Sequence, residues 1–448
     1  MPPRSQICAA IAAFAVLCVA ACGDGGRGLT PPPALTIGGT LSGLATGQQV
    51  VLTDNGADSL TLSTNGSFTF ATGIASGGSY SVSVATQPTG QTCTVAGASG
   101  SNVGADVTTV NVSCTSPAQY AYVANSGDNT VSQYTIGAAG ELTPTSTPTV
   151  QTGTAPQSVA VDPTGRYAYV PNLNDNTVSQ YTIGTGGSLV PMMPATVQTG
   201  SGPWAVSIDP GGSYAYVINS IDHTVSQYVI GAGGTLSPMT PATVAAGTQP
   251  WGITFDPAGQ YAYVADHLDN TVSQYAVGAK GTLTPLSPPT LASGALPSGV
   301  AVDPAGLYAY VADSNDNTIS QYIIDSGGVL APQSPAIAAS GTGPRYIAVN
   351  PSGQNAYVAN YTLGGAGTIS QYTIGAGGLL APMAIPLVAA GKGPAWITVD
   401  RAGQHAYVVN TNDNTVSQFA IGADGSLSPL GASTVATGLK PLSIALVN

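Results

Sequence analysis

Residues 120–137 read YAYVANSGDNTVSQYTIG, and close copies of this stretch recur along the rest of the chain. The copies begin at Tyr120, Tyr167, Tyr214, Tyr261, Tyr308, Asn355 and His405. The first five steps are 47 residues long, and the sixth is 50 because of an insertion near residues 361–367. A fixed period in this range, with strand-like residues and no helical period, predicts a propeller of four-stranded blades.

One full repeat predicts four strands separated by turns. The expected strands are residues 158–161, 167–171, 177–183 and 195–198. Asp162, Pro163 and Gly165 suit the first, second and fourth positions of a type I turn. Residues 174–176, Asn-Asp-Asn, supply side-chain acceptors for a tight hairpin between the second and third strands.

The two ends of the repeat array complement each other. The array begins with a second strand at Tyr120, and it ends at residues 441–447 with a match to the first strand. The C-terminal strand therefore has no blade of its own, and the three strands that begin at Tyr120 have no inner strand. Joining them closes the ring and leaves no exposed sheet edge. We therefore predict a seven-bladed β-propeller over residues 117–448.

A separate β module is expected before the propeller, over residues 35–116. Short alternating runs occur here, with Gly, Asn and Asp between them, which predicts an immunoglobulin-like or prealbumin-like β-sandwich. The runs are residues 35–43, 49–53, 59–63, 67–71, 79–85, 92–95 and 108–113. The stretch NGSFTF and the VNVSC that follows later resemble small exported sandwich modules of bacterial surface proteins, which implies a spacer.

The N-terminus has the features of a secretory leader, predicted over residues 1–21. Arg4 precedes an apolar run that is shorter than the roughly 20 residues needed to span a bilayer. The run ends in VAACGD, which resembles the lipobox of bacterial lipoproteins and implies lipidation of Cys22. An ordinary signal peptide with an incidental Cys is the alternative. Residues 22–34 are expected to form a flexible tether.

The leader and the lipobox resemblance predict a protein of the bacterial cell envelope, attached to a membrane through the lipid anchor only. Gly23 follows Cys22 where inner-membrane lipoproteins carry Asp, which favours the outer membrane or its periplasmic face. Cleavage would leave Cys93 and Cys114 as the only other cysteines, and an even pair in an exported domain predicts a disulfide.

Composition limits the partners. Charged residues make up only 6% of the chain, the net charge is −12, and the 8 Lys and Arg residues are scattered. Nucleic-acid binding requires clustered cations, so we expect no nucleic-acid partner. We predict no cofactor and no metal, and a monomer that binds an unidentified small molecule or protein.

The repeats resemble YVTN-type propellers and lactonase-family propellers, the latter including 6-phosphogluconolactonases. The stretches YVANSGDNTVSQYTI and PxxVAVDPxGxYAYV carry this resemblance, which extends over residues 117–448. It implies the seven-bladed fold and, as one function, hydrolysis of a sugar-type lactone.

Residues that vary between repeats are the best candidates for function, because constant ones are explained by blade packing. Two consecutive slots at the start of each first strand are expected to surround the central channel on one face, the top face. The first slot holds Gln157, Trp204, Trp251, Ser298, Arg345, Ala395 and Leu442, and the second holds Ser158, Ala205, Gly252, Gly299, Tyr346, Trp396 and Ser443.

All three Trp residues of the chain fall in these two slots. Exposed Trp is unfavourable unless something covers it, which favours an aromatic-lined ligand site. The predicted ligand-binding residues are Trp204, Trp251, Arg345, Tyr346 and Trp396. The alternative is that these rings pack between neighbouring blades.

The predicted top hairpin loops add polar side chains. They carry His223, Asp266, His267, Asp313 and Tyr361. Asp266 and Asp313 with His267 have the donors of a weak metal site, whereas solvated loop residues are the simpler interpretation.

Lactone hydrolysis needs a general base and a group that stabilises the oxyanion. The available candidates are Arg345, Asp266 and His267, with Asp313 and Lys440 as further charged groups. They do not form a recognisable catalytic cluster. The leading hypothesis is therefore ligand or protein binding through the top face, with a lactonase or a structural surface spacer as alternatives.

Overall fold

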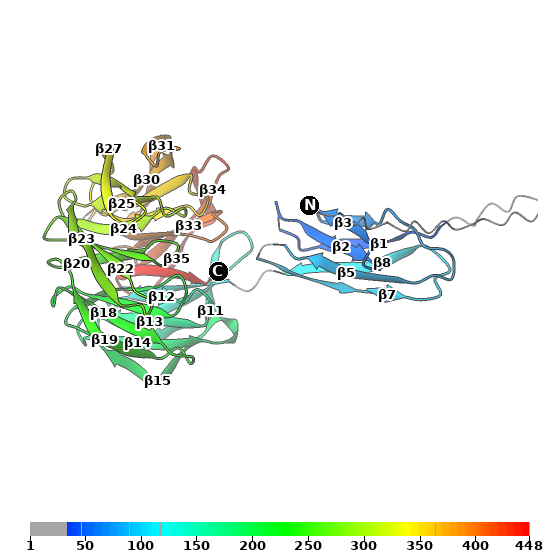
Figure 1. Cartoon of the computed structure of the whole chain (residues 1–448), viewed down its shortest axis with the longest axis horizontal. Coiled ribbons are helices and arrows are strands. Elements are labelled where there is room, and N and C mark those ends of the chain that lie inside the picture. Colours follow the sequence, from blue (N-terminus) through cyan, green and yellow to red (C-terminus); the bar gives the residue numbers. More distant parts are fainter. Residues whose placement is uncertain (1–33, 46, 89, 116–118, 363, 448) are drawn as a thin grey trace, which may run out of the picture. The chain divides into compact units, whose positions relative to one another are not determined.

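The computed structural model describes residues 34–447 except 46, 89, 116–118 and 363 (Figure 1). These residues form 36 strands and one short 3-10 turn, η1 (Thr185–Gly187). The chain divides into two compact units, Met1–Pro117 and Ala118–Asn448. In the part of the chain that the structure describes, no helix has the length and apolar character needed to cross a membrane. The predicted leader, the tether and Cys22 lie outside the described residues.

The first unit is built of two four-stranded sheets, with strand orders β4-β1-β8-β6 and β3-β2-β5-β7. The strands are β1 (Ile37–Ser42), β2 (Val50–Asp54), β3 (Asp58–Leu62), β4 (Gly66–Thr69), β5 (Tyr80–Thr86), β6 (Thr92–Ala96), β7 (Ser99–Gly100) and β8 (Val107–Thr115). Side chains from both sheets form one core, in which Ile37, Val50 and Val110 are fully buried. The two-residue strand β7 has no counterpart among the predicted strands.

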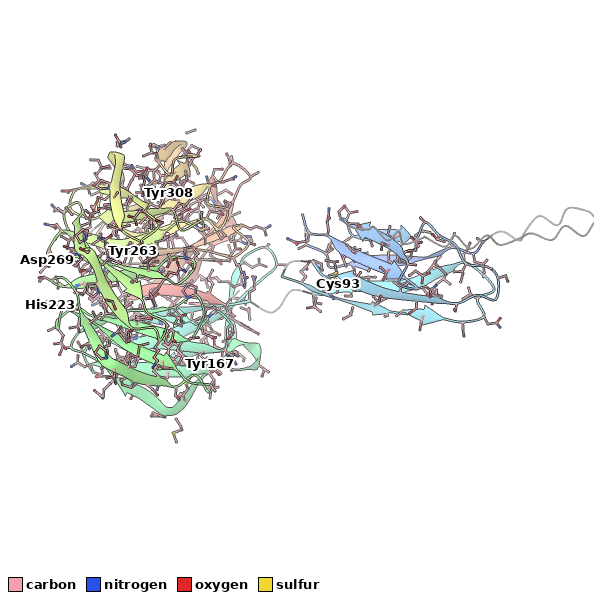
Figure 2. The ribbon with its side chains drawn as sticks, in the orientation of Figure 1. Cys93, Tyr167, His223, Tyr263, Asp269 and Tyr308 are labelled. Atoms are coloured by element: carbon pink, nitrogen blue, oxygen red, sulfur yellow. A yellow bond between two sulfur atoms is a disulfide. The ribbon has the colours of Figure 1, made fainter. Side chains whose placement is uncertain are left out.

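Cys93 and Cys114 lie opposite each other on the paired strands β6 and β8. Both side chains are buried, and their sulfur atoms are joined as a disulfide; Cys93 is labelled in Figure 2. This is the pair expected from the sequence, and its oxidation in the cell stays a prediction.

The second unit is a propeller of seven four-stranded sheets, numbered here as blades 1–7. Blade 1 has the strand order β36-β9-β10-β11, and blades 2–7 use β12–β15, β16–β19, β20–β23, β24–β27, β28–β31 and β32–β35. All neighbouring strands within these blades are antiparallel. The all-β fold and the seven blades predicted from the sequence are confirmed.

The four strand positions repeat with little change from blade to blade. First strands are β12 (Ala160–Val161), β16 (Pro203–Ile208), β20 (Pro250–Phe255), β24 (Pro297–Val302), β28 (Pro344–Val349), β32 (Pro394–Val399) and β36 (Pro441–Val447). Second strands are β9 (Gln119–Asn125), β13 (Tyr167–Asn172), β17 (Tyr214–Asn219), β21 (Tyr261–Asp266), β25 (Tyr308–Asp313), β29 (Asn355–Asn360) and β33 (His405–Asn410). Third strands are β10 (Thr130–Ile136), β14 (Thr177–Ile183), β18 (Thr224–Ile230), β22 (Thr271–Val277), β26 (Thr318–Ile324), β30 (Ala366–Ile374) and β34 (Thr415–Ile421). Fourth strands are β11 (Leu142–Gln151), β15 (Leu189–Gln198), β19 (Leu236–Ala245), β23 (Leu283–Ala292), β27 (Leu330–Ala339), β31 (Leu380–Lys392) and β35 (Leu427–Ala436).

The ring closes in blade 1, where strands from the two ends of the propeller pair. β36 runs antiparallel to β9, with Ile444 opposite Val123. In Figure 1 the red C-terminal strand lies among the cyan strands that begin the propeller. The predicted closure by residues 441–447 is therefore confirmed.

The fourth strand is longer than the sequence predicts, because a bulge interrupts its alternation. In blade 2 the strand begins at Leu189 instead of residue 195. Ser179 pairs with Thr196, but Tyr181 pairs with Pro191, so the register shifts on either side of Gln180. A bulge of this kind breaks the period-2 pattern by which a strand is recognised.

The side chain of Gln180 fills the gap that the bulge opens. Its Nε2 donates to the Pro194 carbonyl within the same blade, at 3.1 Å. Its Oε1 accepts from the backbone N–H of Leu236, in the next blade, at 2.6 Å. The seven Gln–Leu pairs that join blades are Gln133–Leu189, Gln180–Leu236, Gln227–Leu283, Gln274–Leu330, Gln321–Leu380, Gln371–Leu427 and Gln418–Leu142. The last pair joins blade 7 to blade 1, so the bonds follow the whole ring.

We expect Gln274→Ala to lower the free energy of unfolding by about 2–4 kcal/mol, because both bonds of a buried amide are lost. Gln260→Ala removes an exposed amide from the same blade and is expected to change stability by less than about 0.5 kcal/mol. Urea denaturation of the two variants measures the difference. Equal stabilities would show that the glutamine does not join the blades.

Candidate functional site

A cavity of about 430 Å³ lies where the first strands of all seven blades meet. Its wall is formed mainly by residues at the start and middle of these strands. At the top face, the first-strand start lies beside the end of the second strand, as in the pairing of Pro250 with Asp266. The channel mouth is therefore bordered by the two sequence slots that vary between blades.

The five predicted ligand-binding residues all line this cavity and are half-buried. Trp204 and Trp251, from blades 3 and 4, stack with ring centroids 4.9 Å apart. Tyr346 and Trp396, from blades 6 and 7, stack at 3.5 Å. The rings therefore pack between neighbouring blades and also form the cavity wall. Their role in binding stays a prediction.

Two glycines allow the backbones of neighbouring blades to approach at the mouth. A Cβ atom on Gly252 would lie 2.5 Å from the Ser298 carbonyl oxygen. A Cβ atom on Gly299 would lie 2.9 Å from the Arg345 carbonyl oxygen. Blade 5 thus presents only Ser298 and Gly299 at the mouth, which leaves room for a side chain from blade 6.

Arg345 of blade 6 uses this room and reaches Trp251 of blade 4. Its Cζ atom is 5.4 Å from the Trp251 ring centroid and 5.0 Å from that of Tyr361. Such cation–π contacts hold a guanidinium in place without neutralising it. Arg345 has no hydrogen bond or ion pair with any residue that the structure describes. Burial lowers the pKa of Arg345, but an arginine remains charged near neutral pH.

Tyr361 is held at the start of the longer loop in blade 6. Its backbone N–H donates to the Gly343 carbonyl at 2.7 Å. A Cβ atom on Gly343 would lie 2.4 Å from the Tyr361 carbonyl oxygen, so glycine is required for this approach. The loop that carries the three extra residues therefore supplies the second ring beside Arg345.

His267 lies behind the cavity wall. Its ring stacks on Trp251 with centroids 3.7 Å apart, and its Nδ1 is 3.0 Å from the Pro297 carbonyl oxygen. Since a carbonyl only accepts, Nδ1 carries the proton. Burial lowers the pKa of His267, with Arg345 acting in the same direction, so the ring is neutral near pH 7. His267 does not line the cavity.

Asp266 and Asp313 are fully buried at the ends of β21 and β25, which differs from their expected place in the hairpin loops. Ser273 Oγ donates to Asp266 Oδ2 at 2.7 Å, and Thr271 Oγ1 does so at 3.1 Å. In blade 2, Asn172 bonds to the equivalent two hydroxyls. The aspartates therefore brace the hairpin as the asparagines do, and neither lines the cavity.

The other candidate charged groups also lie away from the cavity. His223 is exposed, and its Nδ1 accepts from the Gln249 backbone N–H at 3.0 Å (Figure 2). Lys440 is exposed in the turn before β36. No group of three or more His, Cys, Asp or Glu residues within the described ranges is arranged to hold a metal ion.

One layer of the wall was missed by sequence reasoning. A ring of small residues, one from each first strand, lies opposite the tyrosine of each second strand. This small-residue ring is Ala160, Ser207, Thr254, Ala301, Ala348, Thr398 and Ala445. All of its members line the cavity. The only sign of this ring in the sequence is that its position holds Ala in some repeats and Ser or Thr in others. Such variation is also common among buried core residues, so it did not stand out.

Burial raises the pKa of Asp266 to about 6, from 3.8. The folded state therefore holds an extra proton between these pH values, and stability falls as the pH rises through this window. We expect Asp266→Asn to raise the free energy of unfolding at pH 8 by roughly 1–3 kcal/mol and to have little effect below pH 4. Denaturation at both pH values tests this, and a gain independent of pH would contradict it.

Comparison with solved structures finds the same architecture in other bacteria. A putative 6-phosphogluconolactonase from Bacteroides fragilis has a TM-score of 0.65 and 18% identity, over 74% of this chain and 98% of that one. A periplasmic gluconolactonase from Pseudomonas aeruginosa has a TM-score of 0.62 and 18% identity, over 74% and 99%. A protein from Lactobacillus plantarum has a TM-score of 0.63 and 19% identity, over 74% and 100%. At these identities the likeness concerns the fold.

No curated protein matches the chain. The family model described as "Lactonase, 7-bladed beta-propeller" matches residues 42–327, 224–361 and 355–448, which together cover most of the sequence. The chain belongs to this lactonase family of seven-bladed β-propellers.

Proposed function

We propose that the propeller binds a small anionic ligand at the mouth of its central channel. Arg345 carries this proposal, because its half-buried guanidinium lines the cavity and has no anionic partner among the described residues. A buried charge is unfavourable unless an opposite charge or hydrogen bonds compensate it. An anion on Arg345 would supply both.

The cavity and its rings support a small ligand over a protein. The volume of about 430 Å³ is in the range of small-molecule sites. Trp251 Nε1 is buried and has no hydrogen-bond acceptor among the described residues, which leaves a donor for a ligand. The two stacked aromatic pairs, Trp204 with Trp251 and Tyr346 with Trp396, add apolar surface to the cavity wall.

Hydrolysis of a sugar-type lactone is the second candidate, favoured by the family and by the neutral His267 near Arg345. In that reaction Arg345 would polarise the lactone carbonyl, and His267 would activate water. The described residues that line the cavity include no carboxylate and no imidazole, so a base is not placed beside a bound lactone. Binding is therefore the better supported function.

We expect Arg345→Gln to weaken the binding of a carboxylate probe, D-glucuronate, about 10- to 100-fold, because charge-assisted hydrogen bonds are lost. Isothermal titration calorimetry measures this, and quenching of Trp fluorescence is a second readout because all three Trp residues line the site. Arg166→Gln, an exposed arginine outside the cavity, is the control and should bind like the wild type.

Equal affinities of the two arginine variants would contradict the proposal. If Trp204→Ala, Trp251→Ala and Trp396→Ala each left the affinity for D-glucuronate unchanged, a role of the aromatic side chains in binding would be excluded. The same proteins are assayed with glucono-δ-lactone by pH-stat titration, where we expect no acceleration. Acceleration that is lost in Arg345→Gln and His267→Asn would establish the hydrolase instead. A purely structural spacer would show neither binding nor hydrolysis.

We also propose that the chain is exported and anchored to a membrane of the cell envelope through a lipid on Cys22. In a bacterial host, we expect the wild type in the membrane fraction and Cys22→Ser in the soluble fraction. Cys18→Ser, which changes a cysteine of the leader, should remain with the membranes. Retention of Cys22→Ser in the membrane fraction would contradict the anchor.

A further inference from the structure

The hydroxyls of the small-residue ring occur only in the blades that carry a Trp at the mouth. Ser207 follows Trp204 in β16, and Thr254 follows Trp251 in β20. Thr398 lies two residues after Trp396 in β32, whereas Ser207 and Thr254 lie three residues after their Trp. The other four blades have no Trp at the mouth and place Ala in the ring. Each indole at the mouth therefore has a hydroxyl group deeper in the same strand.

These three hydroxyls are unused within the protein. Ser207, Thr254 and Thr398 are half-buried, line the cavity and make no side-chain hydrogen bond with the described residues. Other serines of the wall differ. Ser158 Oγ accepts from the Val206 backbone N–H at 3.0 Å, and Ser298 Oγ donates to the Leu296 carbonyl at 3.3 Å. The ring hydroxyls are thus available to polar, uncharged groups of a ligand.

The wall of the central cavity carries one positive charge. Arg345 is its only ionised side chain among the described lining residues, since burial raises the pKa of Tyr346 and keeps that phenol neutral. One guanidinium compensates one carboxylate. A second negative charge would lie in an uncharged wall, where desolvation is unfavourable.

We infer that the ligand is a hydroxylated six-membered ring bearing a single carboxylate, the chemistry of a uronic acid, and is not a sugar phosphate. The inference rests on the proposed binding function and specifies its ligand. The carboxylate would pair with Arg345, the apolar face of the sugar ring would pack on an indole, and the ring hydroxyls would bond to Ser207, Thr254 and Thr398.

Four probes separate these contributions in calorimetric titrations of the full chain. D-glucuronate has the charge and the hydroxyls, cyclohexanecarboxylate has the charge alone, D-glucose has the hydroxyls alone, and glucose 6-phosphate has a higher charge. We expect glucuronate to bind at least about tenfold more tightly than each of the others, because each loses hydrogen bonds, the ion pair or charge compensation.

A triple variant tests the hydroxyls directly. We expect Ser207→Ala/Thr254→Val/Thr398→Val to weaken glucuronate about 10- to 100-fold while cyclohexanecarboxylate affinity stays unchanged. The matched control is Ser237→Ala/Thr284→Val/Ser428→Ala, which removes three exposed hydroxyls from the fourth strands of the same blades. It should bind both probes like the wild type. The unchanged affinity for cyclohexanecarboxylate also shows that the triple variant is folded.

The outcomes distinguish this inference from the proposed function. Equal binding of glucuronate and cyclohexanecarboxylate, or tighter binding of glucose 6-phosphate, would overturn the uronic-acid assignment and leave anion binding intact. Equal loss of both carboxylates in the triple variant would also overturn it, because the hydroxyls would then not select the ligand. The absence of binding by every anionic probe would overturn both.

Discussion

The buried glutamine of each third strand is the interaction on which the propeller depends. One amide group satisfies the bulge in its own fourth strand and the first backbone N–H of the fourth strand in the next blade, as Gln180 does with Pro194 and Leu236. A buried amide that loses either hydrogen bond lowers the stability of the fold, because the unsatisfied polar group is no longer in contact with water. The bulge within one blade and the junction with the next blade therefore depend on the same side chain. Because Gln418 bonds to Leu142 in the same way, the junction between the two ends of the array is equivalent to the other six.

This regular frame leaves function to the few positions where blades differ. The tyrosines of the second strands illustrate the frame, since Tyr169 is fully buried and donates to the Gly234 carbonyl of the next blade. Departures cluster at the top of blades 3, 4, 6 and 7, where indoles, a phenol and Arg345 replace small or aliphatic side chains. The glutamine bonds that join the blades are the same in all seven blades, whereas ring contacts at the mouth among the described residues, such as Trp204 with Trp251, occur only where these departures lie.

The architecture was predictable because its signals are local and repeated. The period, the turn residues and the match between residues 441–447 and a first strand lead to seven blades without any tertiary information. The fourth strand was underestimated because the bulge after Leu189 replaces alternation with a run that includes Pro191 and Pro194. The burial of Asp266 was missed for a different reason, since a residue at a strand end can face a loop or its own hairpin.

The site was predictable in its members but not in its contacts. The slots placed Trp251 and Arg345 at one mouth, because equivalent positions of a propeller converge on the axis. Their contact across blade 5 depends on the reach of one side chain over Gly299, and no spacing in the sequence encodes that reach. The hydroxyls of Ser207 and Thr254 were missed because they are candidates for ligand contacts only if no protein group bonds to them. The sequence does not show which side chains bond to each other, whereas the structure does.

The pairing of β36 with β9 has a consequence for how the chain acquires its structure. Blades 2–7 each use strands that are consecutive in sequence, whereas blade 1 joins residues from opposite ends of the propeller. Contacts between residues so far apart in sequence form slowly, because closing the long loop between them costs chain entropy before the contacts contribute any stability. Strands β9–β11 can pair with one another locally, but β9 gains its inner neighbour only from the last residues of the chain. The seam makes a complete polypeptide a condition for a complete ring, and a chain cut short during synthesis would keep an open sheet edge.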